Sequence, residues 1–528
     1  MEMGLHIAVV SNIIFEPYFV SLTKRLFGEN TVVLPIPFGE HTEEEYQTQL
    51  ASADLVIVWL YLENMFPGLY FNAAKQNLDE AIVLYKKLYA DLTSISQAKI
   101  LWLLFENYEL PLSATVGHVY HDFVDKLNLA LKDTLGDQVL FIDLRHLIAE
   151  IGISNAYDSK SKYRWNAPYS KILIEAAVKE IHKQYLIING KTPKCLVLDC
   201  DNVLWGGILS EDGIENLKLS GSGLGRVYQD FQRFVLSLYY HGVILAVCSK
   251  NDLSDVSTMF RGHSEMVLKE EQIACFQVNW EDKPSNIQKI AEKLNIGLDS
   301  MVFVDDSPIE IEAVKVMLPE ITPILFQRDM EYELFSCFNL KSNVSIADVD
   351  KRNETYRTDG FREELKAKHT DYADYIAALE IKMDIHEALP IEYSRISELT
   401  QRTNKCTNGR RYTVTEIKKR ITSKAVKLYS VYVSDRFSDL GLVGAVEVEG
   451  NTLTLFSLSC RALGREIEGK MIEFILEKCQ VKKIEFKSTG KNEAIKTLLS
   501  EYSARDCAPQ PLKLSIHSGG IEHPCRCR

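Results

Sequence analysis

The chain has 528 residues, of which 46% are hydrophobic and 25% are charged, and its formal net charge is −13. With 27 Gly and 15 Pro, the composition excludes collagen-like, disordered and small disulfide-stapled proteins. At roughly 150 residues per domain the length predicts three or four domains, and the overall acidity argues against general nucleic-acid binding.

Residues 1–188 alternate between short strand-like runs and longer segments of helical period. This alternation predicts a parallel sheet covered on both faces. Ligands bind such sheets at the carboxyl ends of the strands, which here lie near Ser11 and Glu106. Strands are expected at residues 5–10, 31–36, 55–60, 99–105 and 139–144, and helices at 72–90 and 120–134.

Residues 194–340 repeat the alternation after a polar break at residues 189–194, which predicts a second α/β domain. Strands are expected at residues 195–198, 243–247 and 301–304, and helices at 224–240, 285–294 and 309–317.

The remaining residues change pattern. Residues 341–380 are strongly charged and predict a helical connector, and residues 381–528 predict a third domain of α+β type. Its strands are expected at 426–433, 442–448 and 452–458, and its helices at 413–420 and 466–479. This last third is mildly basic while the rest is acidic. The difference either attracts an acidic protein or a phosphorylated cofactor, or reflects an ordinary solvated surface.

The sequence predicts neither a membrane span nor an export signal. The longest apolar run, residues 55–62, is far shorter than the ~20 residues that cross a bilayer, and the N-terminus lacks a basic start and a long apolar stretch. Most of the 11 Cys residues lie in apolar runs, which indicates reduced, buried thiols. We therefore expect a cytoplasmic protein without a membrane partner.

Carboxylates at two predicted strand ends give the strongest chemical signal. Asp199 and Asp201 follow the strand at 195–198 and, two residues apart, point the same way. Asp305 follows the strand at 301–304, and three carboxylates bind a hard cation better than two. Ser249 follows a third strand, and Lys283 precedes a helix. Acids that merely cap loops would explain an isolated pair but not this whole set.

The ordered set Asp-x-Asp, Ser, Lys and Asp-Asp resembles the haloacid dehalogenase (HAD) superfamily of phosphatases and phosphotransferases. The resemblance implies that Asp199 attacks phosphorus and that Asp201 acts as the acid and then the base. It also implies that Ser249 and Lys283 hold phosphoryl oxygens. Mg²⁺ is then bound by Asp199, by Asp305 and by the backbone carbonyl of Asp201. The residues expected around the phosphate and the metal ligands are Asn202, Asp306 and Lys250.

The segment after Asp201 is short, so only a minimal cap is expected over the site. The turn at residues 205–207 and the stretch at 211–213 read as a short flap. An open site suits a substrate attached to a macromolecule, or requires another domain as its lid.

Longer motifs at residues 194–207, 248–251 and 303–308 resemble the FkbH-like family. That resemblance implies a flavodoxin- or SGNH-like α/β domain, a HAD-like Rossmannoid domain with a minimal cap, and a GNAT-like α+β domain. It further implies that a three-carbon unit from 1,3-bisphosphoglycerate loses its phosphate. The glyceryl group is then delivered to the phosphopantetheine thiol of an acyl carrier protein.

A protein thiol is expected to hold the glyceryl group in between. Cys248 is the candidate because it precedes Ser249 at the rim of the site, where neighbouring lysines favour a thiolate. The alternative is that Cys248 packs inside the sheet, since it alternates with Ser249. Cys200 presents the same two alternatives.

The flanking domains carry weaker signals. Ser11 stands where SGNH hydrolases have their nucleophile, but no His follows near residues 155–169, so a non-catalytic domain is expected. The loop at residues 458–468 resembles an acyl-CoA loop, with Arg461, Gly464 and Arg465 expected to bind acyl-pantetheine. Glu466 occupies a position where that loop has Gly or Ala, which disfavours CoA itself. Two alternative functions remain: a simple HAD phosphatase on another phosphoester, and a non-catalytic scaffold.

Overall fold

The computed structural model describes residues 4–14, 17–73, 76–108, 118–136, 139–327, 330–340, 345–369, 371–504 and 513–516. Contacts divide the chain into two compact units, residues 1–186 and residues 187–518. The last residues of the predicted third domain, 517–528, lie outside the described part. Among the described helices, none is both long enough and apolar enough to cross a membrane.

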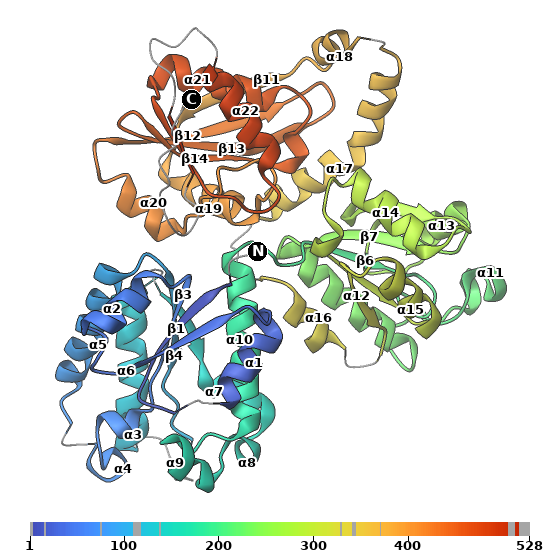
Figure 1. Ribbon diagram of the computed structural model, residues 1–528. Coiled ribbons are helices and arrows are strands. Elements are labelled where there is room, and N and C mark those ends of the chain that lie inside the picture. The colour runs from blue at the N-terminus through green and yellow to red at the C-terminus, as the bar shows by residue number, and fades with distance from the viewer. Residues whose placement is uncertain are drawn as a thin grey trace. The chain divides into compact units, whose positions relative to one another are not determined.

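The first unit contains a five-stranded sheet in the order β2-β1-β3-β4-β5, and all neighbouring strands are parallel. Helices α5 and α6 cover one face of this sheet, and α1 and α10 lie on the other (Figure 1). Each of the five predicted strands overlaps an observed one. The strands are His6–Ser11 (β1), Val32–Pro37 (β2), Leu55–Trp59 (β3), Lys99–Leu104 (β4) and Leu140–Asp143 (β5).

Both predicted helices of this unit overlap an observed one, although the helix expected at 72–90 begins only at Leu78. The helices of this unit are Tyr18–Phe27 (α1), Glu44–Ala51 (α2), Leu62–Met65 (α3), Leu69–Asn72 (α4), Leu78–Ile95 (α5), Val119–Leu135 (α6), Leu144–Ile151 (α7), Ile153–Ala156 (α8), Ser159–Trp165 (α9) and Lys171–Ile188 (α10). Tyr85 of α5 and Leu127 of α6 pack with Val56 and Val58 of β3 in one buried core cluster. Strand alternation places these two valines on the same face of the sheet.

The second unit contains a second parallel sheet, in the order β10-β9-β6-β7-β8. Its strands are Cys195–Leu198 (β6), Ile244–Ser249 (β7), Ile273–Val278 (β8), Met301–Asp305 (β9) and Thr322–Leu325 (β10). The three central strands were predicted, whereas the edge strands β8 and β10 were missed. Pro323 lies within β10, and proline in a strand is tolerated at a sheet edge.

Both faces of this second sheet are buried. Leu196 and Leu198 pack in a core cluster with residues of α12 and α13, whereas Val197 packs in another cluster with residues of α14 and α15. The helices are Leu209–Asp212 (α11), Gly225–Tyr240 (α12), Leu253–Gly262 (α13), Lys283–Lys293 (α14), Pro308–Met317 (α15) and Glu331–Cys337 (α16).

The rest of the second unit contains a mixed sheet in the order β11-β12-β13-β14-β15-β16. The pairs from β11 to β14 are antiparallel, and those from β14 to β16 are parallel. The strands are Lys382–Glu387 (β11), Val426–Ser434 (β12), Asp439–Glu449 (β13), Thr452–Leu458 (β14), Lys483–Phe486 (β15) and Lys513–Ile516 (β16). The helices are Tyr393–Arg402 (α19), Val414–Arg420 (α20), Ile467–Cys479 (α21) and Glu493–Ala504 (α22).

Two helices lie between the parallel and the mixed sheets in sequence, Ile346–Ala367 (α17) and Tyr372–Ala378 (α18). Val349 of α17 belongs to the core on one face of the parallel sheet. Arg362 of α17 forms a buried ion pair with Asp435, which follows β12, at 2.8 Å. The helix predicted as a connector is therefore packed against both sheets.

Candidate active site

Three polar residues meet at one edge of the second sheet because they follow neighbouring parallel strands. Asp199 follows β6, Ser249 ends β7 and Asp305 ends β9, and β9, β6 and β7 are adjacent. The backbone N–H of Asp199 donates to the carbonyl of Val304 at 3.0 Å, which fixes the two acidic strand ends side by side. All three polar side chains are buried.

Lys283 connects these strand ends. It begins α14, and its Nζ lies 2.8 Å from Asp199 Oδ1 and 2.8 Å from Asp305 Oδ2. The same ammonium donates to the backbone carbonyl of Cys248 at 3.1 Å. Lys283 is only 2% exposed, so its charge is offset by these carboxylates rather than by water.

The negative charge of the carboxylates at this edge exceeds the positive charge beside them. Burial raises the pKa of Asp199 and of Asp305, and Lys283 lowers each only in part. Burial and the neighbouring Asp305 raise the pKa of Asp306. Burial by itself would lower the pKa of Lys283, but the two carboxylates outweigh it and the pKa is raised. One ammonium therefore does not fully compensate the cluster.

Asp199, Asp305 and Asp306 form a group that fits a divalent cation. One carboxylate oxygen from each lies within 4.8 Å of the others. Carboxylate oxygens are the donors that Mg²⁺ and Ca²⁺ prefer, and a cation would supply the missing charge. Asp306, predicted to lie around the metal ligands, is thus close enough to be one itself.

The side chain of Asp201 lies outside that group. Its Oδ1 accepts from the Trp205 indole at 2.8 Å and from the Leu209 backbone at 3.1 Å, and its Oδ2 accepts from Asn251 at 3.0 Å. Asn251 also donates to Ser249 Oγ at 3.1 Å. The sequence assigned no role to Asn251, although its position two residues after Ser249 on the same loop is the signal that could have found it.

Asn202 and Lys250 have definite partners. Asn202 has a left-handed backbone with φ 54°, its Oδ1 accepts from the Gly207 backbone at 2.9 Å, and its side chain hydrogen-bonds Asp306. Asn tolerates this conformation better than most residues. Lys250 lies 2.6 Å from Glu310, so its ammonium is paired away from the acidic group.

The two cysteines next to the site are buried. Cys248 and Cys200 are both 0% exposed and lie in the core clusters on opposite faces of the sheet. Burial raises the pKa of the Cys248 thiol to about 12, with Lys283 lowering it only in part. Of the two alternatives for Cys248, this environment favours packing over acyl carriage, because a thiol of such pKa is almost wholly protonated near neutral pH.

The segment between β6 and α12 is small. It contains α11 and an isolated bridge between Gly206 and Lys218, and Gly207 has φ 110°, where a side chain would be strained. The site is therefore flanked by a short flap on this side.

Ser11 ends β1 in the first unit, and its hydroxyl is engaged with the main chain. Its Oγ donates to the Trp59 carbonyl at 2.6 Å and accepts from the Ile13 backbone at 2.9 Å. Among the hydrogen bonds of the described residues, none joins Ser11 to a His ring. The arrangement lacks the base that a serine nucleophile needs.

The predicted pantetheine-binding loop is held by contacts within the protein. Arg461 is buried and donates to the Leu440 carbonyl at 2.7 Å. Arg465 is also buried and lies 3.0 Å from Asp359 and 3.6 Å from Asp435. Gly464 has φ 72°. These contacts give Arg465 a structural role in joining α17 to the mixed sheet.

Neither a protein-family model nor a curated protein matches this chain. The chain is similar to the N-terminal part of the protein BF1531 from Bacteroides fragilis, whose crystal structure contains a phosphatase domain complexed with Mg. The identity is 25%, the match covers 64% of this chain and 94% of that chain, and the TM-score is 0.54.

Two other solved structures match a smaller part of the chain. The lipase Lip_vut3 from a goat rumen metagenome is 13% identical, with 34% of this chain and 97% of that chain covered and a TM-score of 0.27. A catalytic mutant of Axe2, an acetylxylan esterase from Geobacillus stearothermophilus, is 15% identical, with 34% and 96% covered and a TM-score of 0.26. Similarity this weak does not bear on activity. Of these three, the BF1531 comparison bears on the site, because that structure contains a phosphatase domain complexed with Mg.

Proposed function

We propose that this chain is a Mg²⁺-dependent phosphatase or phosphotransferase of the HAD type that acts through Asp199. One observation carries the proposal: the buried Lys283 ammonium lies 2.8 Å from both Asp199 and Asp305 at the strand edge. The similarity to a protein with a phosphatase domain complexed with Mg supports it.

Asp199, Asp305 and Asp306 would hold the metal, since their oxygens already converge. When bound, Mg²⁺ supplies the positive charge that offsets the phosphoryl oxygens and the carboxylates around them. Lys283 and Ser249 lie beside Asp199 and would hold the remaining phosphoryl oxygens.

Asp199 would act as the nucleophile. Its carboxylate oxygen forms a bond to phosphorus while the bond from phosphorus to the leaving oxygen breaks, and Asp201 gives that oxygen a proton. Water then attacks the aspartyl phosphate, its proton passes to Asp201, and inorganic phosphate and free Asp199 are released. Three N–H donors fix the Asp201 carboxylate. A carboxylate has about four lone-pair sites, so one remains for the proton.

Phosphate release from p-nitrophenyl phosphate tests this assignment. We expect activity that EDTA abolishes and Mg²⁺ restores, and a loss of roughly 10³-fold or more in Asp199→Asn, the scale for removing a nucleophile. Asp230→Asn is the matched control because Asp230 is an exposed acid of α12 paired with Arg226 and Arg233. Full activity in Asp199→Asn would exclude an aspartyl-phosphate route.

The finer proposal concerns the substrate. The FkbH-like motifs support removal of phosphate from a phosphoglyceryl unit derived from 1,3-bisphosphoglycerate and transfer of glyceryl to an acyl carrier protein thiol. In this proposal the first α/β unit is an SGNH-like domain without hydrolase activity, and the mixed sheet belongs to a GNAT-like domain that receives the carrier. The short flap supports a carrier-bound substrate, because it leaves the site without a large lid.

Intact-mass analysis separates the alternatives. The full chain is incubated with Mg²⁺, 1,3-bisphosphoglycerate and a holo acyl carrier protein, and the mass of the carrier is measured. A glyceryl adduct on the carrier supports the transfer reaction. Phosphate release without an adduct supports a simple phosphatase. If neither phosphate nor an adduct is formed, the result supports a scaffold.

A further inference from the structure

A second polar site lies at the opposite edge of the parallel sheet from Asp199. Lys194 precedes β6 and Ile244 begins β7, and both line a pocket that α17, α19 and the loop after β14 close. Asp199 follows the other end of β6, so the length of that strand, about 13 Å at 3.3 Å per residue, separates the two sites. A ligand in this pocket is therefore not at the reacting phosphorus.

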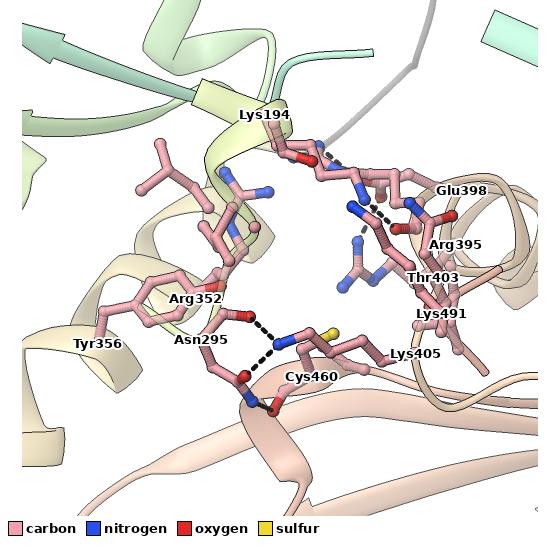
Figure 2. A pocket seen from close by; sticks show the side chains of 18 residues that line it. Lys194, Asn295, Arg352, Tyr356, Arg395, Glu398, Thr403, Lys405, Cys460 and Lys491 are labelled. Atoms are coloured by element: carbon pink, nitrogen blue, oxygen red, sulfur yellow. Dashed lines mark hydrogen bonds and ion pairs between the residues drawn. The ribbon is translucent and has the colours of Figure 1, made fainter. Parts of the chain in front are cut away.

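The pocket is lined by many cations and few anions. Its volume is about 100 Å³, and a single water needs roughly 10–15 Å³ of such space, so a group larger than water fits. Among the described residues that line it, Glu398 is the one carboxylate. The basic residues are Lys194, Arg352, Arg395, Arg402, Lys405 and Lys491. Figure 2 shows Arg352 on one wall and Arg395 on the facing one.

Glu398 cannot balance this charge because two arginines already share it. It pairs with Arg395 and, at 3.2 Å, with Arg402. Lys491 is paired with Asp299 outside the pocket.

The other three cations contact only neutral oxygens among the described interactions. Lys194 donates to the Arg402 carbonyl at 2.5 Å. Lys405 donates to Asn295 Oδ1 at 2.6 Å, as Figure 2 shows. Arg352 is 8% exposed and donates from Nη2 to the Gly242 carbonyl at 2.7 Å, whereas its Nε has no hydrogen-bond partner.

Such a surplus of buried charge is unfavourable without a counter-ion. Burial and, to a smaller extent, the nearby Arg402 together lower the pKa of Lys194 to about 8. Burial likewise lowers the pKa of Arg352 to about 10, again with a contribution from Arg402. An anion in the pocket would relieve both groups at once.

We propose that this pocket binds a phosphate or diphosphate group. A phosphate carries more than one negative charge and several acceptor oxygens, so it can take hydrogen bonds from cations on different walls simultaneously. Guanidinium groups match phosphate geometry, and lysine ammonium groups add point charges. The phosphate could come from a free phosphorylated metabolite or from a longer phosphorylated arm, and both present the same group to the pocket.

Isothermal titration calorimetry of the full chain with sodium pyrophosphate, in the presence of EDTA, tests the proposal. Lys405→Met and Lys491→Met are chosen because neither residue is buried, so neither substitution should disturb the core. Lys289→Met is the control because Lys289, on α14 and paired with Glu281, has a side chain about as exposed as that of Lys491. We expect pyrophosphate to bind each pocket variant at least tenfold more weakly and to bind Lys289→Met as it binds the unmodified chain. Its affinity for every one of these proteins should fall as the NaCl concentration rises.

Two results would overturn the proposal: no pyrophosphate binding to the unmodified chain at millimolar concentration, or equal binding by the control and both pocket variants. Asp199→Asn should bind as the unmodified chain does. Tighter binding there would place the anion at the catalytic edge, where the Asp199 carboxylate otherwise repels it, and would equally refute the assignment. Pantetheine 4′-phosphate then identifies the source. Tighter binding than pyrophosphate indicates a phosphorylated arm, and weaker binding indicates a free anion.

Discussion

Replacing Lys283 with Met tests the electrostatic arrangement on which the proposed chemistry depends. Lys283 is 2% exposed and lies 2.8 Å from each of two buried carboxylates. Methionine has a similar length but no charge. The substitution therefore leaves Asp199 and Asp305 facing each other without a cation.

The expected cost is large. Removing one partner of a buried ion pair destabilises a protein by about 3–5 kcal/mol, because the remaining charge stays desolvated. Here two carboxylates lose the same partner, so we expect a loss of about 4 kcal/mol or more at pH 7.5. Typical proteins have an unfolding free energy of about 5–15 kcal/mol, so the variant should still fold.

The loss is measured as the free energy of urea unfolding, taken from the transition of the second unit, with EDTA present. Lys289→Met is the matched control on the same helix, since Lys289 and its partner Glu281 are both well exposed. An exposed ion pair contributes about 0–1 kcal/mol, so the control should be nearly as stable as the unmodified chain. Adding Mg²⁺ should restore part of the stability of Lys283→Met, because a ligand that binds only the folded state stabilises it.

The pH dependence gives a further check. Without Lys283, burial holds the pKa of Asp199 and Asp305 above the value in the unfolded chain. The cost of the buried charges is then fully present at high pH and shrinks as pH falls and the acids are protonated. The reasoning is refuted if Lys283→Met and Lys289→Met unfold with the same free energy in EDTA at pH 7.5.

Three other predictions follow from buried groups away from that cluster. Burial opposes ionisation of Glu398, but two arginines of α19 outweigh it and lower its pKa to about 2 from 4.5. This shift corresponds to about 3 kcal/mol of folding stability. The contribution is present above pH 4.5 and is lost as the pH falls toward 2. In Glu398→Gln the unfolding free energy should therefore fall less steeply between pH 4.5 and pH 2 than in the unmodified chain. An unchanged slope would contradict the lowered pKa of Glu398. Asp435→Asn removes the carboxylate that lies 2.8 Å from the buried Arg362 and leaves that guanidinium only Asp359, at 2.9 Å, as a carboxylate partner among the described ion pairs. We expect a loss of about 3 kcal/mol in the free energy of urea unfolding, at the lower end for a broken buried pair. A loss below about 1 kcal/mol, the range of an exposed pair, would refute the buried pair. Cys248 should resist iodoacetamide in the native chain and react after unfolding, as peptide mass mapping would show, whereas rapid native labelling would favour an acyl-carrying role.

Hydrophobic patterning was enough to predict the central strands of both parallel sheets and most of the catalytic edge. Buried central strands such as β6 and β9 are nearly uninterrupted apolar runs, so their ends, and therefore Asp199 and Asp305, were predictable. Of the edge strands in these sheets, β2 and β5 were predicted, whereas β8 and β10 were missed. In β10 the apolar run is short and carries Pro323.

The structure was needed to find the further polar groups that join the site at the catalytic edge. Asn251 bridges Asp201 and Ser249, and Asp306 joins Asp199 and Asp305, through distances that depend on how strands are ordered in the sheet. The basic pocket depends still more on packing. Lys194, Arg352 and Lys405 are separated by long stretches of sequence, and each alone is typical of a solvated surface. They line one pocket only because α17 and α19 close over the amino ends of the parallel strands, and no local sequence pattern encodes that contact.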